Sequence, residues 1–356
     1  TSGLYNLQYH ALLRRDEKGR FHMHPLLRQL AGEKLGDPAT SELAAQAADR
    51  HSSYFAGFLE SFAADLQRGA GQEVLQTILR DQANLRAAWG HAAQVGQWGA
   101  IAGCLDGAHY FYQRMGLFGD EAALIDGAIT AVRTAMEPGD LFLAALLSRL
   151  LTVRARDYMN SAQFAEGIET AEEACALADR LGDKNLEGQA RLAWARIHST
   201  QHKREAALGQ FEKVVVLAKG AQNQFLEADG WIGVGGQLIW QEDVSKMQEA
   251  LYHALDLCRT LRYQSGEMET LHYLGTLETR REAFAAAGGY HKQALTLSRL
   301  LGDVAAEAEE LGSLGVVLNL QGDLPGSQIY QQEALATFRR LNMTESEAWM
   351  LGELGY

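Results

Sequence analysis

Two histidines and a group of glycines are the residues whose spacing first suggests chemistry in this sequence. His22 and His24 alternate along an extended segment and share one face, which permits metal binding. No third ligand stands nearby in the sequence, so we expect no metal site there. Residues 230–236 are rich in glycine, but the spacing is wrong for a dinucleotide-binding loop and no strand precedes it. We expect a thin helix face with room for a ligand or a bend, and no phosphate site.

No other arrangement of residues predicts catalysis. The phosphate-binding motif G-x-x-x-x-G-K-[ST] is missing, and the sequence contains no Gly-Lys pair. Cys104, Cys175 and Cys258 are widely spaced in apolar helical segments. We expect them to be buried, reduced thiols, as in a cytoplasmic protein, rather than disulfide or metal ligands. The chain is therefore expected to hold no catalytic residue and no cofactor.

The charge of the chain limits its partners. The formal net charge is −13, which argues against non-specific binding to nucleic acids because phosphate contacts need a basic face. No apolar run approaches the roughly 20 residues of a membrane span, so no membrane partner is expected. Arg14, Arg15, Lys18 and Arg20 form a basic hairpin that either touches DNA as a wing does or is simply solvated; we favour the solvated hairpin.

The elements that position these residues are predicted by internal repetition. Only four prolines occur among 356 residues, which favours helix almost everywhere. Two series of residues recur at intervals of 40, the second always eight residues after the first. They are Glu187, Glu227, Glu267, Glu307 and Glu347, and Ala195, Gly235, Gly275, Gly315 and Gly355. This period indicates an array of similar units that stack on their neighbours.

Each unit is predicted to contain two helices. Leu311, Leu314 and Leu318 form an i, i+3, i+7 stripe on a first helix, residues 321–323 form a turn, and a second helix follows. Gly182 and its counterparts are expected to end the second helices, because glycine accepts the left-handed conformation. The small residue beside the leucine stripe allows two helices to approach closely. Residues 97–136 are predicted to form one more, divergent pair.

The order of leucine, glycine and alanine positions in these units resembles tetratricopeptide repeats. The pattern Leu311-x-x-Leu314-Gly315 is followed by Ala334, and Leu271-x-x-Leu274-Gly275 by Ala294. The period of 40 departs from the usual 34 residues, which implies longer helices or connections. The resemblance implies an all-α fold: a right-handed superhelix of tetratricopeptide-like helix pairs, preceded by a small winged-helix remnant.

The remnant is predicted from a different pattern near the start of the chain. Two short extended segments flank a turn at residues 16–19, and Pro25 then opens a helix at a permitted first-turn position. Strand, turn, strand and helix are the last elements of a winged-helix unit. We therefore divide the chain into a winged-helix remnant (1–36), a helical linker (37–96) and the repeat superhelix (97–356).

Residues 4–95 resemble the STAND class of signal-transduction ATPases. The stretch Phe-His-Met-His-Pro-Leu-Leu-Arg at residues 21–28 is similar to the Met-His-Asp segment of that class, with Pro25 in place of the acidic residue. Residues 84–89, Asn-Leu-Arg-Ala-Ala-Trp, are similar to the stretch that leads into its helical arm. The resemblance implies that His24 helps to hold a bound ADP in a full-length protein with an upstream nucleotide-binding domain. We accordingly expect the chain to be a C-terminal fragment that continues beyond Tyr356, without ATPase activity of its own.

The inner surface of such a superhelix is lined mainly by first helices. We predict the residues of this concave face by counting along each first helix from its small residue. Asp229 and Glu269 occupy the same position in their units as Arg149 and Gln189. The residues of the predicted concave face are Arg149, Arg156, Gln189, Arg196, Trp240, His272, Thr276 and Asn319. The three arginines suggest a grip for an anion or carboxylate, although solvated arginines are the commoner alternative.

Two functions remain open from the sequence. One is a sensor arm in a bacterial STAND-type regulator of transcription, whose concave face binds a small-molecule inducer, a peptide or a protein and controls activation. The other is a scaffold whose repeats hold a protein partner without a switch. The sequence identifies neither the ligand, nor the output domain, nor the oligomeric state.

Overall fold

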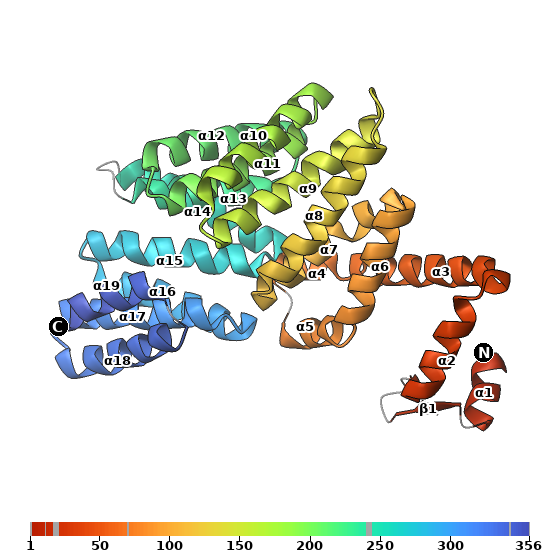
Figure 1. Ribbon diagram of the computed structural model, residues 1–356. Coiled ribbons are helices and arrows are strands. Elements are labelled where there is room, and N and C mark those ends of the chain that lie inside the picture. The colour runs from red at the N-terminus through yellow and green to blue at the C-terminus, as the bar shows by residue number, and fades with distance from the viewer. Residues whose placement is uncertain are drawn as a thin grey trace.

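The computed structural model describes residues 2–10, 12–16, 21–69, 71–239, 244–341 and 343–355. It is 85% helical, and consecutive helices pack as pairs (Figure 1). The predicted fold class, a superhelix of tetratricopeptide-like helix pairs, is confirmed.

The described residues among the first 36 form a small unit at the end of α3 (Ser41–Glu60), as Figure 1 shows. It contains α1 (Ser2–Tyr9), strands β1 (Leu13–Arg15) and β2 (Phe21–Met23), and α2 (Pro25–Leu35). The strands are antiparallel, with Arg14 opposite His22, so the predicted hairpin and following helix are confirmed. Residues 17–19 of the predicted turn lie outside the described residues. The assignment of this unit to a winged helix stays a prediction.

Four helices and a short 3₁₀ turn connect this unit to the repeats. They are η1 (Pro38–Thr40), α3, α4 (Ala63–Arg68), α5 (Gln72–Leu79) and α6 (Gln82–Val95). The predicted divergent pair follows as α7 (Trp98–Met115) and α8 (Phe118–Ala135). One hydrophobic core runs without a break from Leu59 through Trp89 and Phe111 to Ala190. The linker helices therefore pack as part of the same body as the first repeats.

The repeats follow the predicted 40-residue period along their whole length. The first helices are α9 (Leu141–Asn160), α11 (Lys184–Thr200), α13 (Gln224–Leu238), α15 (Gln264–Arg280), α17 (Val304–Leu320) and α19 (Thr344–Leu354). The second helices are α10 (Phe164–Leu181), α12 (Arg204–Ala221), α14 (Val244–Leu261), α16 (Phe284–Leu301) and α18 (Leu324–Leu341). Gly182 ends α10 in the left-handed conformation, with φ of 66°. The predicted helix stop is confirmed at this position.

The small residue of each first helix receives a side chain from the second helix of the same unit. Gly235 lies against Leu251, Gly275 against the ring of His291, and Gly315 against Gln331. A Cβ added at Gly275 would stand 2.5 Å from Nε2 of His291, closer than side chains tolerate. The expectation of room for a ligand at residues 230–236 is wrong, because packed side chains fill that space. Phe211 lies against Gly233, and Tyr273 against Gly236.

The repeating glutamate joins one unit to the next. In four of the second helices, α12, α14, α16 and α18, a basic residue in the last turn pairs with the glutamate in the first turn of the following helix, whereas Glu187 pairs with Arg191 of its own helix. The pairs are Lys219–Glu227 (3.7 Å), Arg259–Glu267 (2.9 Å), Arg299–Glu307 (2.7 Å) and Arg339–Glu347 (2.8 Å). Because their basic side chains are about half exposed, each pair contributes little to stability, and their joint effect is to fix the register between units.

The linker helices close the superhelix into a ring. Nη2 of Arg114 on α7 donates a hydrogen bond to the backbone oxygen of Leu301 at 2.6 Å. Gly69 packs against Leu301, and Gln72 lies against Gly302 at the end of α16. Segments more than 180 residues apart in the chain thus lie side by side, with α4 and α5 facing the α15–α16 unit (Figure 1).

We expect Arg114→Ala to loosen this closure without changing the helices. A hydrogen bond from a charged donor is worth about 1.5–3 kcal/mol, so local opening should become about tenfold or more frequent. Hydrogen exchange of residues 63–79 should accelerate accordingly, while helical content by circular dichroism stays the same. Arg133→Ala, which removes an exposed pair with Glu173 on the outer surface, is the matched control. Equal exchange in both variants would show that Arg114 does not hold the ring closed.

No helix in the described part of the chain is both long enough and apolar enough to cross a membrane.

Candidate functional site

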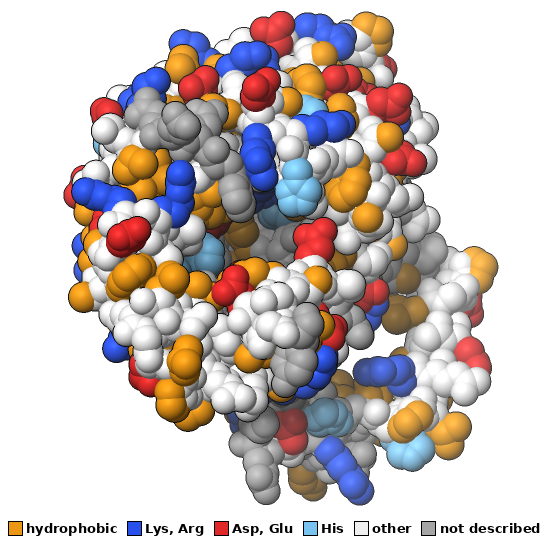
Figure 2. Space-filling view, turned by 90° about the vertical axis from the view of Figure 1, so that its left-hand side faces the viewer, with side chains coloured by type: hydrophobic (Ala, Val, Ile, Leu, Met, Phe, Trp, Pro, Cys, Tyr) orange, Lys and Arg blue, Asp and Glu red, His pale blue; other side chains and the backbone are white. Residues whose placement is uncertain are grey.

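The ring encloses a central cavity with two lobes. One lobe has a volume of about 560 Å³ and the other about 410 Å³, and both are lined by Gln67, His109, Tyr110 and Arg156. Figure 2 shows a hollow in the molecule with basic, acidic and histidine side chains around it. The first helices of five units, α9, α11, α13, α15 and α17, supply most of the walls, together with α4 and α7. The volume suits a small ligand or a short peptide.

The structure brings most of the predicted concave-face residues together. Arg149, Arg156 and Gln189 line the smaller lobe; Arg156, Arg196 and His272 line the larger one. Their role in binding stays a prediction. Thr276 and Asn319 do not line either lobe, and the hydroxyl of Thr276 donates to the backbone oxygen of His272 at 3.1 Å. Trp240 lies outside the described residues.

His24 lies far from this cavity in the fold, at the start of α2. It is the N-cap residue of that helix, and its Nδ1 accepts a hydrogen bond from the backbone nitrogen of Leu26 at 3.3 Å. His22, the other histidine of the hairpin, makes a 2.8 Å contact with Asp16. The two rings therefore have separate local partners, and nucleotide sensing by His24 stays a prediction.

One register of the first helices runs across the cavity from basic to acidic. The residues at this position, 40 apart, are Arg149, Gln189, Asp229, Glu269 and Glu309. Arg149 is held by Asp106 at 3.0 Å and by the backbone oxygen of Ala102 at 2.8 Å. Neither Glu269 nor Glu309 makes an ion pair with another described residue, and burial within the ring raises the pKa of both. The acidic end therefore lacks a fixed cation and suits a cationic group on a ligand.

The basic wall is held in place by a chain of hydrogen bonds. Nη1 of Arg156 lies 2.7 Å from Nε2 of His109, and Nδ1 of His109 lies 2.9 Å from Oε1 of Glu121. Since arginine only donates, Nε2 of His109 accepts and Nδ1 carries the proton that is donated to Glu121. Burial, followed by the charge of Arg156, lowers the pKa of His109, which is therefore neutral. Nε of Arg156 has no hydrogen-bond partner among the described residues.

A pair of buried carboxyl groups lies behind this wall. Glu121 is 1% exposed and Asp157 is fully buried, and the two carboxyl groups are close enough for each to affect the pKa of the other. The amide of Gln113 donates to both, at 2.9 Å and 3.3 Å. Burial raises the pKa of both, and the neighbouring carboxyl adds to the increase at Asp157. Two such groups cannot both ionise in contact, so they hold a shared proton near neutral pH.

Arg196 lies near Arg156, on the next first helix α11, and has a different set of partners. Its Nη2 lies 3.5 Å from Oδ1 of Asp229, and the hydroxyl of Tyr263 donates to the same oxygen at 2.9 Å. Burial lowers the pKa of this guanidinium, but the carboxylates of Asp229 and Glu269 outweigh it and raise the pKa overall. Arg196 is therefore a permanent positive charge whose weak 3.5 Å pairing leaves it available to an anionic group.

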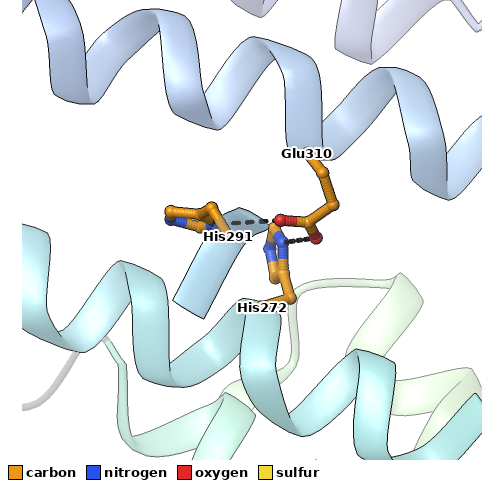
Figure 3. Close-up of side chains that lie close together, drawn as sticks. All are labelled: His272, His291 and Glu310. Atoms are coloured by element: carbon orange, nitrogen blue, oxygen red, sulfur yellow. Dashed lines mark hydrogen bonds and ion pairs between the residues drawn. The ribbon is translucent and has the colours of Figure 1, made fainter. Parts of the chain in front are cut away.

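The structure also shows a cluster that the sequence analysis missed. His272, His291 and Glu310 come from three consecutive helices, α15, α16 and α17, and meet at the wall of the larger lobe (Figure 3). Sequence reasoning placed His272 on the concave face but recognised neither of its partners. The repeat itself contained a signal for this cluster. His272, His291 and Glu310 occupy positions at which the other units have mostly apolar or small residues.

Comparisons with known proteins support the fold alone. No protein-family model matches the chain, and no curated protein matches it. The structure of BtubC (BKLC) from P. vanneervenii is similar, with a TM-score of 0.52 and 16% identity, covering 63% of this chain and 92% of that one. A second similar structure is that of a Signal Transduction ATPase with Numerous Domains (STAND) protein with a tetratricopeptide repeat sensor from Pyrococcus horikoshii. Its TM-score is 0.52 and its identity 12%, covering 99% of this chain and 55% of that one. The chain thus spans about half the length of the Pyrococcus protein.

Proposed function

We propose that the chain is the sensor arm of a STAND-type regulatory ATPase and that a ligand in the central cavity controls how tightly the ring closes. The cavity carries this proposal, because its walls come from two parts of the chain that meet only when the ring is closed. Leu66 and Gln67 of α4 face residues of α15 and α17 across the larger lobe.

A ligand in this position would act as a switch for a simple thermodynamic reason. A molecule that contacts both walls binds the closed ring more tightly than an open one, so it shifts the equilibrium toward closure. The residues that meet α16 at the closure, Gly69 and Gln72, belong to the stretch of helices, α3 to α6, that connects the repeats to the N-terminal unit. Ligand binding in the cavity would therefore change the conformation at the N-terminal end of the chain, where the nucleotide-binding domain is proposed to lie.

The charges of the cavity indicate the class of ligand. Arg156 and Arg196 lie on one side, and Glu269 and Glu309 on the other. A dipolar molecule with an anionic and a cationic end, such as a short peptide with free termini, complements both walls. Small-molecule inducers with the same two charges fit the same description, whereas a folded protein would have to insert a terminal segment.

The STAND assignment rests on the resemblance of residues 21–28 and 84–89 to that class. The similar Pyrococcus structure is described as a STAND protein with a tetratricopeptide repeat sensor, which is the architecture proposed for the full-length protein. In that protein an upstream domain would bind ADP or ATP, with His24 near the phosphate, and the output would be control of transcription. The three cysteines are free and buried, which agrees with a reducing, cytoplasmic location.

The alternative is a scaffold that binds a partner in the cavity without switching. The two functions differ in whether the occupant changes the closure between α5 and α16. Spin labels on Glu73→Cys and Leu300→Cys, both exposed positions, would report this distance by pulsed electron resonance. A narrower distance distribution on binding supports the sensor, and an unchanged one supports the scaffold.

Replacing both cavity arginines is expected to weaken ligand binding. Arg156→Ala with Arg196→Ala removes two charged donors, each worth about 1.5–3 kcal/mol to a bound carboxylate, so affinity should fall at least about tenfold. Native mass spectrometry would first identify molecules that co-purify, and calorimetry with mixed short peptides would follow. Peptides with acetylated and amidated ends, which lack both charges, should bind weakly to every variant.

Arg339→Ala is the matched control, since it removes an exposed arginine whose partner is Glu347 on the outer surface. Circular dichroism should show the same helical content in both variants. A cavity that retains no molecule and binds no peptide in the unmodified protein would contradict the proposed ligand class. Equal affinity in the double variant would contradict the proposed role of the arginines.

A further inference from the structure

The side chains of His272, His291 and Glu310 form a compact cluster of metal-ligand type. Nδ1 of His272 lies 2.7 Å from Oε1 of Glu310, and Nδ1 of His291 lies 2.7 Å from Oε2 of the same carboxylate (Figure 3). One ligand atom from each residue lies within 4.8 Å of the others. Among the described residues, this is the group of three or more histidine, cysteine and acidic side chains whose geometry suits a metal ion.

The fold does not need these residues at these positions. The equivalent positions in the preceding unit are Ile232, Leu251 and Thr270, all buried, and the following unit has Gly312, Gln331 and Met350 there. Leu251 packs against Gly235 in the same way as His291 packs against Gly275. A buried polar cluster costs free energy that an apolar one does not. A role beyond packing explains why two imidazoles and a carboxylate meet at this one junction between units.

The cluster is open on one side only. The side chains of His291 and Glu310 are 2% and 3% exposed, whereas that of His272 is 30% exposed and lines the larger lobe of the cavity. An ion held by the three residues would be shielded by α15, α16 and α17, and its remaining coordination positions would face the cavity. Three protein ligands with an open position are typical of sites that also bind water or a small molecule.

The ligand atoms define the class of ion. Two imidazole nitrogens and one carboxylate suit a first-row divalent cation such as Zn²⁺, Co²⁺, Ni²⁺, Mn²⁺ or Fe²⁺, and the absence of a thiolate among the three argues against Cu⁺. Ligands at about 2.1 Å from a tetrahedral ion stand about 3.4 Å apart, so the 2.7 Å contacts need only widen slightly. Each imidazole would bind the ion through Nδ1 once that nitrogen has given up its proton, exchanging its hydrogen bond to Glu310 for a bond to the ion.

We propose that His272, His291 and Glu310 bind one first-row divalent cation at the wall of the central cavity. The ion ties three consecutive helices together, and its open positions are accessible to whatever occupies the cavity. This proposal is independent of the ligand class and of the STAND assignment, because it rests on the three side chains and their place in the repeat.

The chain itself supplies the variant that tests the proposal. His272→Ile, His291→Leu and Glu310→Thr together restore the residues of the preceding unit, so the packing has a precedent in the same protein. The protein, without an affinity tag, would be stripped with chelator and titrated with Zn²⁺ by calorimetry, and its metal content measured by mass spectrometry. The unmodified protein should bind one Zn²⁺ with a gain of a few degrees in Tm, and the triple variant should bind none.

Two further measurements guard against misinterpretation. His22→Ala with His24→Ala removes the exposed histidines of the hairpin and should leave the Zn²⁺ stoichiometry at one. Glu310→Gln, which keeps the shape of the side chain, should lower the affinity at least about tenfold even if the triple variant folds poorly. Bound Co²⁺ should give visible absorption bands typical of nitrogen and oxygen ligands. Failure of the unmodified protein to bind Zn²⁺ or Co²⁺ at 100-micromolar concentrations, or equal binding by Glu310→Gln, would overturn the proposal.

Discussion

Gly107→Ala is expected to lower the free energy of unfolding by about 2 kcal/mol, because the new methyl group meets backbone. An added Cβ at Gly107 would stand 2.6 Å from the backbone oxygen of Leu59, at the end of α3. That backbone cannot move away easily, since the same oxygen accepts a hydrogen bond from Phe62. The contact between α3 and α7 would have to widen, and with it the core that joins the linker helices to the repeats. Urea unfolding followed by circular dichroism measures the change.

Gly127→Ala is the control for this substitution. Gly127 lies in the interior of α8, where an added Cβ has no neighbour within 4 Å among the described residues. Alanine is the better helix former, so this variant should be more stable by about 0.5–1 kcal/mol. A similar gain in stability for Gly107→Ala would show that α3 and α7 are not in close contact.

The stability of the protein is expected to fall as pH rises from 7 to 9, by about 2 kcal/mol more than in an Asp157→Asn variant. Burial and the neighbouring carboxyl raise the pKa of Asp157 to about 9, and burial raises that of Glu121 to about 7. An acid whose pKa is higher in the folded than in the unfolded protein contributes its full stabilisation below its ordinary pKa, near 4. This contribution to the free energy of unfolding is lost as pH rises from the ordinary pKa through the pKa of the folded state. Each pH unit in that range costs about 1.4 kcal/mol per proton.

Other groups must be separated from this effect. The pKa of His109 is lowered, so its contribution is lost as pH falls below about 6.5 and does not enter the range from 7 to 9. The pKa of His272 is raised by Glu310 against the effect of burial, so it acts in the same direction as the acids, but equally in the protein and the variant. Glu173→Gln, at an exposed carboxylate paired with Arg133, is the control. Parallel stability curves for Asp157→Asn and the unmodified protein would contradict the shared proton.

Most of the helical architecture could be predicted from the repeat alone. The series of glutamates and small residues placed the first helices 40 residues apart, and the helices begin at Lys184, Gln224, Gln264, Val304 and Thr344. Regular units give this result because each helix pair buries the same positions against the next pair. The register also placed Arg149, Gln189 and the acidic residues that follow them on the inner surface.

Closure of the ring could not be predicted in this way. Its contacts join Arg114 to Leu301 and Gln72 to Gly302, and no local pattern marks residues that far apart. The closure also explains why Thr276 and Asn319 do not line the cavity. Because α4 and α5 meet the array near Ser265, the cavity reaches only the N-terminal halves of α15 and α17, whereas Thr276 and Asn319 lie toward the other ends.

The contact between Arg114 and Leu301 also restricts how this protein can evolve. An open solenoid can gain or lose a unit and keep its binding surface, because each unit touches only its neighbours. Here the arc from α7 to α16 has to return to its starting helices, so the number of units determines whether the two ends meet. After loss of one 40-residue unit, every remaining helix pair could still pack against an adjacent pair. The two ends of the arc would no longer meet, however, and the cavity walls would separate. The number of units is therefore a structural requirement for the closed cavity of this chain.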